Sequence, residues 1–281
     1  MSKKTIIVSR NSGFCFGVKR ALDIAKKALL EKKKVYSLGP IIHNPGVVRE
    51  FSDLGLGVIK DIRKIKDGKA SLLVPSHGAD PGILKRTRFD LIDTTCPFVE
   101  KVQAIVRDLR KNGYFVLIFG NKKHPEVKGL KGIAGRNSLV LETKAEARRF
   151  RAGRRKAALI SQTTAALSGF EGILKEIRKK KIPGFLSFNT VCRNTIERRK
   201  EAEEIAGRVD AMFIIGGRES ANTAKLASSC GKINKNTHHI ESARDIKNSF
   251  LEDRSVIGIA SGASTPPGAV REAVKRIKGI N

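Results

Sequence analysis

Three cysteines stand next to predicted helix starts, although they lie far apart along the chain. They are Cys15, Cys96 and Cys192, and no Cys-x-x-Cys pair is present among the four cysteines. Such spacing argues against a disulfide framework or a local zinc knuckle in a cytosolic protein. Three thiolates brought to one point would suit an iron–sulfur cluster, and one iron left open could bind and reduce a substrate. The alternative is that each cysteine is a small buried side chain.

Three of the five histidines follow predicted strands in turn-like segments: His43, His77 and His124. His43 precedes Asn44-Pro45, the pattern of a helix N-cap followed by proline at the first helical position. A helix N-terminus with a neighbouring histidine suits an anion. Each histidine could equally serve in capping or packing.

Two loops near the C-terminus carry hydroxyl and amide groups where a strand gives way to a helix. Ser220 and Asn222 lie in the first loop, and Ser264 lies in the second. Neither loop has a Walker or Rossmann pattern, so the residues indicate phosphate binding but not nucleotide binding. Simple helix capping is the alternative.

Two further residues could handle protons or a substrate alcohol. Glu126 lies two residues after His124, and a carboxyl group beside an anionic ligand has a raised pKa and can transfer protons. Thr163 follows a predicted strand, where its hydroxyl could orient a substrate alcohol or cap a helix.

Short apolar runs alternate with amphipathic stretches along the whole chain, which indicates an α/β protein with mostly parallel sheets. The predicted strands are Thr5–Ser9, Val35–Leu38, Ser71–Val74, Leu91–Asp93, Phe115–Phe119, Leu139–Leu141, Ala158–Ser161, Phe185–Phe188, Ala211–Ile215 and Val256–Ala260. The predicted helices are Val18–Glu31, Pro45–Leu54, Pro97–Lys111, Ala165–Lys179, Ile196–Gly207, Ala221–Cys230 and Pro267–Lys278. In open α/β sheets, ligands bind at the carboxyl ends of the strands.

The cysteine spacing indicates three similar small α/β units, arranged pseudo-threefold around a central pocket, each offering one thiolate. We expect the first unit to span residues 1–96, joined by the C-terminal segment 265–281, the second 97–192 and the third 193–264. No linker rich in proline, glycine or serine separates them.

The chain is strongly basic: 56 Lys and Arg against 27 Asp and Glu give a net charge of +29. The charge lies in short runs, which we interpret as solvated helix surfaces: Lys32–Lys34, Arg148–Arg149, Arg154–Lys156, Lys179–Lys181 and Arg198–Lys200. Aromatic residues make up only 5% and tryptophan is absent, so no specific nucleic-acid binding is expected. The longest strongly apolar run, Tyr114–Phe119, is far shorter than the roughly 20 residues of a membrane helix, and no secretory signal is visible. A cytoplasmic protein without a membrane span is expected.

Nine segments in order give the chain a clear resemblance to the LytB-type family, the 4-hydroxy-3-methylbut-2-enyl diphosphate reductases. The segments are Gly13–Ala21, Gly39–Asn44, Ser76–Gly78, Asp93–Pro97, His124–Val127, Ser161–Thr164, Asn189–Cys192, Ser220–Asn222 and Gly262–Ser264. Any one of them could arise by chance, but nine in family order are highly specific.

The resemblance implies three α/β units around a central pocket that holds one [4Fe-4S] cluster per chain, with one open iron. Cys15, Cys96 and Cys192 match the cluster ligands, while Cys230 matches none and is expected to be a buried helix residue. The positions that match diphosphate-binding residues are His43, His77, His124, Ser220, Asn222 and Ser264. Glu126 matches the proton-delivering acid, and Thr163 matches the hydroxyl that helps position the substrate.

The reaction that the resemblance implies is a reductive dehydroxylation, the last step of the non-mevalonate isoprenoid pathway. It yields isopentenyl and dimethylallyl diphosphates through two one-electron transfers, with Glu126 delivering a proton. We add the hypothesis that the basic surface attracts an acidic electron donor such as a ferredoxin or flavodoxin. The chain departs from the family at Ala221, where members often have serine, at Asn121–Lys123, and in its basicity.

Two other classes stay open on the residues alone. One is a basic RNA- or ribosome-associated protein in which cysteines and histidines are structural, which predicts no iron and salt-dependent RNA binding. The other is a metal-free transferase that uses the histidine and serine loops to hold phosphate.

Overall fold

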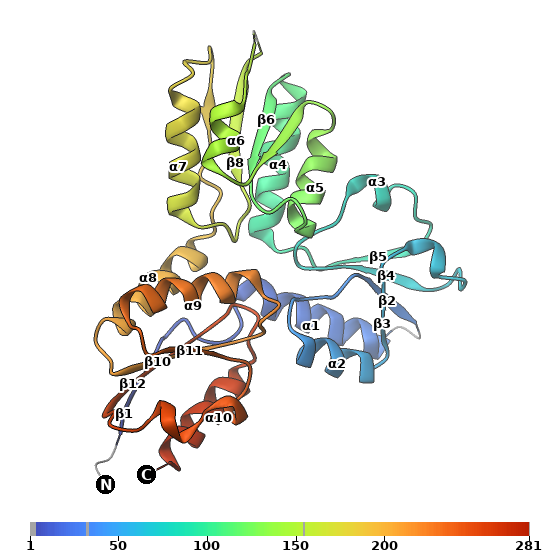
Figure 1. Cartoon of the computed structure of the whole chain (residues 1–281). Coiled ribbons are helices and arrows are strands. Elements are labelled where there is room, and N and C mark those ends of the chain that lie inside the picture. The colour runs from blue at the N-terminus through green and yellow to red at the C-terminus, as the bar shows by residue number, and fades with distance from the viewer. Residues whose placement is uncertain (1–3, 32–33, 154, 281) are drawn as a thin grey trace. The chain divides into compact units, whose positions relative to one another are not determined.

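The computed structural model describes residues 4–31, 34–153 and 155–280 of the 281-residue chain. Figure 1 shows the course of the polypeptide, which divides into two compact units. The first unit contains Met1–Lys19, Ile42–Leu54 and Arg193–Asn281; the second contains Arg20–Ile41 and Gly55–Cys192. Helix α1 (Phe16–Glu31) begins in the first unit and continues in the second. No helix in the described ranges is long and apolar enough to cross a membrane.

The first unit is built on one parallel sheet with the strand order β1-β12-β10-β11. Its elements are β1 (Thr5–Val8), α2 (Pro45–Asp53), α8 (Arg193–Ala206), β10 (Ala211–Ile215), α9 (Ala221–Ile233), β11 (Thr237–Ile240), η2 (Ala243–Asp245), η3 (Asn248–Phe250), β12 (Val256–Ser261) and α10 (Pro267–Lys278). Successive side chains of a strand point to opposite faces, so each face of β10 meets different helices. Phe213 packs with residues of α10, whereas Met212 and Ile214 pack with α8 and α9. Both faces of β10 are therefore buried, which explains its unbroken apolar sequence.

The second unit contains two parallel sheets, with the orders β3-β2-β4-β5 and β7-β6-β8-β9. The first comprises β2 (Val35–Leu38), β3 (Leu56–Ile59), β4 (Ser71–Val74) and β5 (Asp90–Asp93), with η1 (Ile62–Lys64) and α3 (Pro81–Leu84) in its connections. The second comprises β6 (Phe115–Phe119), β7 (Ser138–Leu141), β8 (Ala157–Ser161) and β9 (Leu186–Ser187), with α4 (Pro97–Lys111), α5 (Pro125–Ala134), α6 (Lys144–Arg149) and α7 (Leu167–Arg178).

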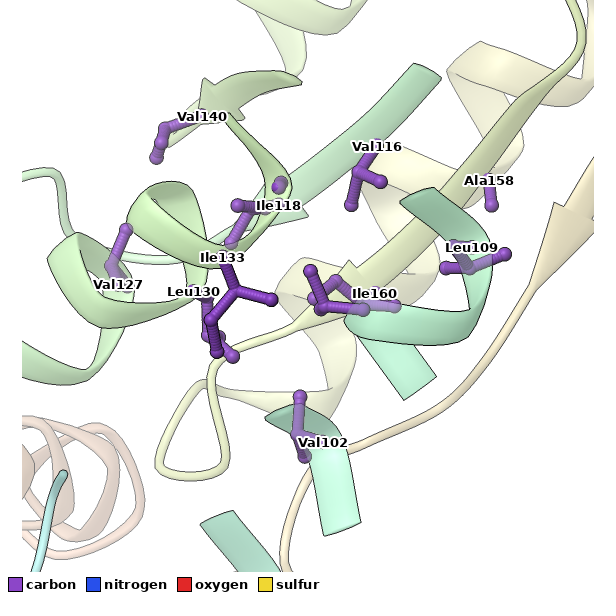
Figure 2. Close-up of a cluster of buried hydrophobic side chains, with 12 residues drawn as sticks. Val102, Leu109, Val116, Ile118, Val127, Leu130, Ile133, Val140, Ala158 and Ile160 are labelled. Carbon is purple, nitrogen blue, oxygen red and sulfur yellow. The ribbon is translucent and has the colours of Figure 1, made fainter. Parts of the chain in front are cut away.

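The core under α4 and α5 is an apolar cluster of the second unit and is drawn in Figure 2. Val106 of α4 and Leu130 of α5 are fully buried against Val116, Ile118 and Ile160 of the sheet. Figure 1 places α6 and α7 on the other face of β6 and β8. The sheet is thus covered on both faces, and only its strand ends are left to carry polar loops.

All three sheets share one strand order. In both sheets of the second unit, the strand that comes first in sequence lies between the second and the third, and the fourth pairs with the third. The orders are β3-β2-β4-β5 and β7-β6-β8-β9. In the third sheet, β10, β11 and β12 take the first three places and the N-terminal strand β1 takes the fourth. The α/β class and the three similar parallel sheets are therefore confirmed, while the pseudo-threefold arrangement around a pocket stays a prediction.

The predicted domain bounds differ from this connectivity at the N-terminus. We expected the segment 265–281 to join a first unit of residues 1–96, but β1 pairs with β12, and α10 packs on the same sheet. Long-range strand pairing of this kind leaves no trace in the local pattern of either segment. The bounds 97–192 and 193–264 stay predictions.

The elements that the sequence pattern missed are weakly patterned ones. Strands β3 and β11 lie at sheet edges, and each buries only one residue, Leu56 or Ile240. Helix α5 contains Gly129 and Gly132, which lower helix propensity. Gly129 lies close to another segment, since a Cβ there would be 3.2 Å from the carbonyl oxygen of Ala79. Helices α3 and α6 have only 4 and 6 residues.

The basic runs lie mostly on the surface, as expected. Arg148, Arg149, Lys179 and Lys181 are exposed, while Lys32, Lys33 and Arg154 lie outside the described residues. The interpretation is wrong for Arg198, whose residue is only 3% exposed. Arg198 is buried because it lies on the same face of α8 as Ala202 and Ile205, and this face packs against the interior.

Candidate functional site

The second unit gathers its predicted site residues in loops that leave the carboxyl ends of its strands. His77 follows β4, Cys96 follows β5, His124 and Glu126 follow β6, and Thr163 follows β8. This is the edge at which open parallel sheets bind ligands. The loops after β6 and β8 approach closely: the amide of Asn121 donates to Gln162 Oε1 at 3.1 Å, and a Cβ on Gly120 would lie 2.8 Å from the Gln162 side chain.

Glu126 and Thr163 form a buried pair at the centre of this loop cluster. Glu126 is 2% exposed and Thr163 5%. The backbone amide of Thr163 donates to Glu126 Oε1 at 2.7 Å, and its hydroxyl donates to Oε2 at 2.9 Å. One residue thus fixes both carboxyl oxygens, which leaves the carboxyl group with a single orientation.

Burial raises the pKa of Glu126 to about 7, against the two hydrogen bonds from Thr163, which lower it. The dominant cause is desolvation, because a buried carboxylate loses its hydration. A carboxyl group with a pKa near neutrality is divided between its two protonation states at physiological pH. It can therefore serve as a general acid or base.

His124 is held at the N-terminus of α5, where it serves as the N-cap. Its Nδ1 accepts a hydrogen bond of 3.2 Å from the backbone amide of Glu126. Because Nδ1 is the acceptor, the ring proton lies on Nε2, which makes that atom a donor. The His77 ring meets His124 edge to face, with ring centroids 6.1 Å apart. The two histidines thus lie together beside the start of a helix, a favourable place for an anion.

The two cysteines of the second unit are tied to the same loops by backbone hydrogen bonds. The amide of Cys96 donates to Ser76 O at 2.9 Å, next to His77. The amide of Cys192 donates to Thr163 O at 2.8 Å. Both cysteines are partly buried. The second unit thus unites every site residue that the sequence assigned to its range.

In the first unit, Cys15 lies in the loop between β1 and α1. Its amide donates to Ala263 O at 3.0 Å, and the amide of Gly13 donates to Ser261 Oγ at 2.7 Å. The Cys15 loop is therefore fastened to the loop that follows β12, the segment that carries Ser264.

His43 and Ser264 lie together at the N-terminus of α2. The hydroxyl of Ser264 donates to His43 O at 3.1 Å, and Asn44 Nδ2 donates to Ser264 O at 3.0 Å. Asn44 also caps α2, since its Oδ1 accepts from Val47 N at 3.1 Å. The predicted N-cap at Asn44 is confirmed, and the same side chain holds the second loop in place.

Ser220 and Asn222 begin α9. Ser220 is the N-cap, and its Oγ accepts from the amide and the hydroxyl of Thr223 at 3.3 and 3.0 Å. Ser220 is only 7% exposed, whereas Asn222 is partly exposed. The start of α2 lies next to this region, because a Cβ on Gly217 would be 3.6 Å from Pro45 Cδ. The first unit thus unites Cys15, His43, Ser220, Asn222 and Ser264 around two helix N-termini.

The cysteines fit an iron–sulfur cluster by donor chemistry. Each is followed directly by a helix, α1, α4 or α8, whose N-terminus favours an anionic group. Each is only partly buried, as a ligand open to an incoming metal must be. No group of three His, Cys, Asp or Glu side chains within residues 4–31, 34–153 and 155–280 already forms a metal site. Cys230, by contrast, is fully buried in α9, as predicted, and burial raises the pKa of its thiol to about 11.

Several residues that position the site went unassigned from sequence. Thr190 pins the end of β8, since its hydroxyl donates to Ser161 O at 2.6 Å and accepts from Ser161 N at 2.8 Å. Gln162 bridges the loops after β6 and β8, and its Nε2 donates to Thr164 Oγ1. The sequence pointed to Thr190 and Gln162 only indirectly, because they lie in the segments Asn189–Cys192 and Ser161–Thr164 that carry the family resemblance.

Comparison with known proteins gives matches along nearly the whole chain. The model of the LytB protein family matches residues 6–278. A 4-hydroxy-3-methylbut-2-enyl diphosphate reductase of Caldanaerobacter subterraneus subsp. tengcongensis is 40% identical over 282 residues, which cover 98% of this chain and 97% of the relative. The enzyme of the same name from Geobacter metallireducens is 38% identical, with 98% of both chains covered.

Two solved structures resemble the fold. One is an (E)-4-hydroxy-3-methyl-but-2-enyl diphosphate reductase, described as the terminal enzyme of the non-mevalonate pathway, with a TM-score of 0.71, 35% identity and 99% and 100% of the two chains covered. The other is the E-1-hydroxy-2-methyl-but-2-enyl-4-diphosphate reductase of Plasmodium falciparum, with a TM-score of 0.90, 25% identity and 97% and 87% coverage.

The raised pKa of Glu126 predicts a pH dependence of folding. Between the ordinary pKa of 4.5 and about 7, the folded chain keeps a proton that the unfolded chain releases. The free energy of unfolding therefore falls as pH rises through this window, by about 3 kcal/mol in total. Urea unfolding of the metal-free chain at pH 5 and pH 8 measures this difference.

Glu126→Gln should remove most of that difference. Glu171→Gln, at an exposed position of α7, leaves Glu126 in place and should retain the wild-type pH dependence. An unchanged difference in Glu126→Gln would show that another group is responsible.

Proposed function

The chain belongs to the LytB protein family, and on this premise we propose that it is a 4-hydroxy-3-methylbut-2-enyl diphosphate reductase. In this reaction the allylic C–O bond breaks, two electrons and two protons are taken up, and water leaves. One proton goes to the departing hydroxyl and the other to carbon, which gives isopentenyl or dimethylallyl diphosphate. The observation that best supports this function is the buried Glu126–Thr163 pair beside two histidines and two cysteines.

We assign proton delivery to Glu126. Burial keeps a large fraction of this carboxyl group protonated near pH 7, where an ordinary glutamate is ionised. The amide and hydroxyl of Thr163 hold the carboxyl group in one orientation and stabilise the carboxylate that is left after proton transfer. Thr163 is also suited to orient the substrate alcohol, because its hydroxyl is hydrogen-bonded to the carboxyl group of Glu126.

Each unit offers groups for a diphosphate. In the second unit, His77 and His124 lie together, and Nε2 of His124 is a donor. In the first unit, His43, Ser220, Asn222 and Ser264 lie at the N-termini of α2 and α9. Neutral donors and helix N-termini bind phosphate without a nucleotide motif. Ala221 lacks the hydroxyl often found in the family, so Ser220 and Asn222 supply the contacts of that loop.

Cys15, Cys96 and Cys192 would hold one [4Fe-4S] cluster. When bound, such a cluster supplies electrons one at a time and a Lewis-acidic iron for the substrate oxygen. The chain's own contribution is to fix the thiol-bearing loops by the hydrogen bonds of Cys15, Cys96 and Cys192 to Ala263, Ser76 and Thr163.

An acidic low-potential protein, such as a ferredoxin or flavodoxin, is the electron donor that the charge favours. A small diphosphate does not account for a net charge of +29, whereas long-range attraction of an acidic partner raises its association rate. A cytoplasmic location stays part of this proposal.

Iron binding is the first test. After anaerobic reconstitution the protein should be brown, with about four iron atoms per chain, and Cys96→Ser should lose most of them. Cys230→Ala is the matched control, because Cys230 is buried in α9 and should not be needed for iron. A wild-type chain that takes up no iron would contradict the proposal, and RNA binding would then be tested for the alternative class.

Proton delivery is tested by turnover of the iron-loaded enzyme. Glu126→Gln should retain its iron but lose at least about 100-fold in kcat, the usual effect of removing a general acid. Wild-type turnover should also decline as pH rises above about 7, where Glu126 loses its proton. Glu171→Gln controls for a change of charge, and near-normal kcat in Glu126→Gln would assign the proton to another group.

The proposed attraction of an acidic electron donor is tested by measuring the rate of reduction at different ionic strengths. The rate of reduction by an acidic ferredoxin should fall steeply between low and moderate ionic strength, because salt screens the attraction. With reduced methyl viologen, which is a cation, the rate should not fall. A flat rate with ferredoxin would remove the steering hypothesis.

A further inference from the structure

Arg198 is a buried cation in the first unit, on α8. Its residue is 3% exposed, whereas the neighbouring Arg199 is partly exposed and Lys200 is exposed. Its Nη1 donates to Ser261 O at 3.0 Å. Its Nε is buried and has no hydrogen-bond partner in the part of the chain that the structure describes. A buried donor without an acceptor is costly and calls for an explanation.

Nearby carboxylates do not provide that explanation. Glu201 is close enough to act on Arg198 electrostatically. Its oxygens, however, accept from Ser9 Oγ and Arg10 N at 2.7 Å and from Asn11 Nδ2 at 2.8 Å. Desolvation is the largest influence on Arg198 and lowers its pKa. The guanidinium is therefore short of a negative partner.

Cys15 is the other group close enough to influence Arg198 when its thiol is ionised. Both residues are fastened to the same short segment. Arg198 Nη1 bonds to Ser261 O, while the amide of Cys15 bonds to Ala263 O at 3.0 Å. The Oγ of Ser261 further accepts from Gly13 N in the Cys15 loop. The guanidinium and the backbone of the cysteine are thus both anchored to residues 261–263.

A second donor close to Cys15 in sequence has no acceptor either. The hydroxyl of Ser12, three residues before Cys15, is buried and without a partner among the described residues. Two unsatisfied donors around one cysteine loop indicate that the site is built for an additional acceptor. Thiolate and sulfide sulfurs are such acceptors, and hydrogen bonds to them tune iron–sulfur clusters.

We propose that Arg198 is a positioning residue for the ligand held at Cys15, where its buried guanidinium provides positive charge to an anionic, thiolate-bound cluster. The cluster part of this inference rests on the proposed function. A positive charge favours the reduced cluster, which is the more negative form, so Arg198 raises the reduction potential. It also favours retention of the cluster at Cys15.

The charge at Cys15 is tested in the full-length chain before iron is added. Cys15 is partly exposed, so it can be alkylated with iodoacetate, an anion, or with iodoacetamide, which is neutral. Both reagents need the thiolate, so the ratio of their rates reports local charge and cancels the thiol's own ionisation. Mass spectrometry of the Cys15 peptide gives this ratio.

Arg198→Gln keeps a donor for Ser261 O but removes the charge, and it should lower the iodoacetate-to-iodoacetamide ratio at Cys15 at least about threefold. Arg198→Lys should retain most of the wild-type ratio. Arg199→Gln is the matched control, because Arg199 pairs with Glu203 at 2.7 Å and should leave the ratio unchanged. An unchanged ratio in Arg198→Gln overturns the proposal. Arg198→Met gives the same test if Arg198→Gln does not fold.

The iron-loaded chain provides the second measurement. Arg198→Gln should have a lower reduction potential and lose iron to a chelator several-fold faster, with Arg198→Lys in between and Arg199→Gln like the wild type. If the wild type binds iron but the potential and iron loss do not change in Arg198→Gln, the role of Arg198 is overturned while the reductase proposal stands. If the wild type binds no iron but the alkylation ratio still depends on Arg198, the reductase proposal fails and the buried charge at Cys15 is upheld.

Discussion

The bond between Thr163 and the Glu126 carboxyl group is the interaction on which the second unit's site depends. It joins the start of α5 to the loop after β8 and fixes both oxygens of a carboxyl group that has lost its water. The same residue accepts from Cys192 through its carbonyl oxygen, so acid, hydroxyl and thiol share one anchor. In the proposed mechanism, the acid and one cluster ligand would therefore be positioned through one residue, whose amide and hydroxyl hold Glu126 and whose carbonyl oxygen holds Cys192.

Helix N-termini are the recurring device of both units. Each candidate ligand cysteine directly precedes a helix, and Asn44, His124 and Ser220 are N-caps. Parallel strands deliver their following helices to one edge of a sheet, so the helix N-termini add partial positive charge to this edge. The strongly basic surface is a separate property. Arg198 belongs to neither group, since it is a full charge placed inside the protein.

The local pattern was enough to predict the strands that are buried on both faces and the longer amphipathic helices. Strands Phe115–Phe119 and Ala211–Ile215 and helix Pro97–Lys111 have the predicted bounds. Helix α5 was missed because its glycines lower helix propensity, whereas their close contact with Ala79 and Asp80 is a tertiary feature that no local pattern reveals. Arg198 was taken for solvated surface because a run of basic residues does not show which one faces inward. The ligand and binding residues were assigned through the family resemblance, whereas the bonds that hold them, such as those of Thr190 and Gln162, depend on tertiary contacts.

The shared strand order has a consequence for how the protein is made. The ribosome delivers β1 before every strand of the second unit, yet its neighbour β12 emerges only after all of them, since Thr5 pairs with Val256. The strands of both sheets of the second unit lie between Val35 and Ser187, so these sheets can assemble while translation continues. The sheet of the first unit cannot form around β1 until β12 has been synthesised. The backbone hydrogen bond of Cys15 likewise forms only after Ala263 has been added. Insertion of the proposed cluster, if it needs the Cys15 loop fixed in place, would on this account follow synthesis of the segment that contains Ala263.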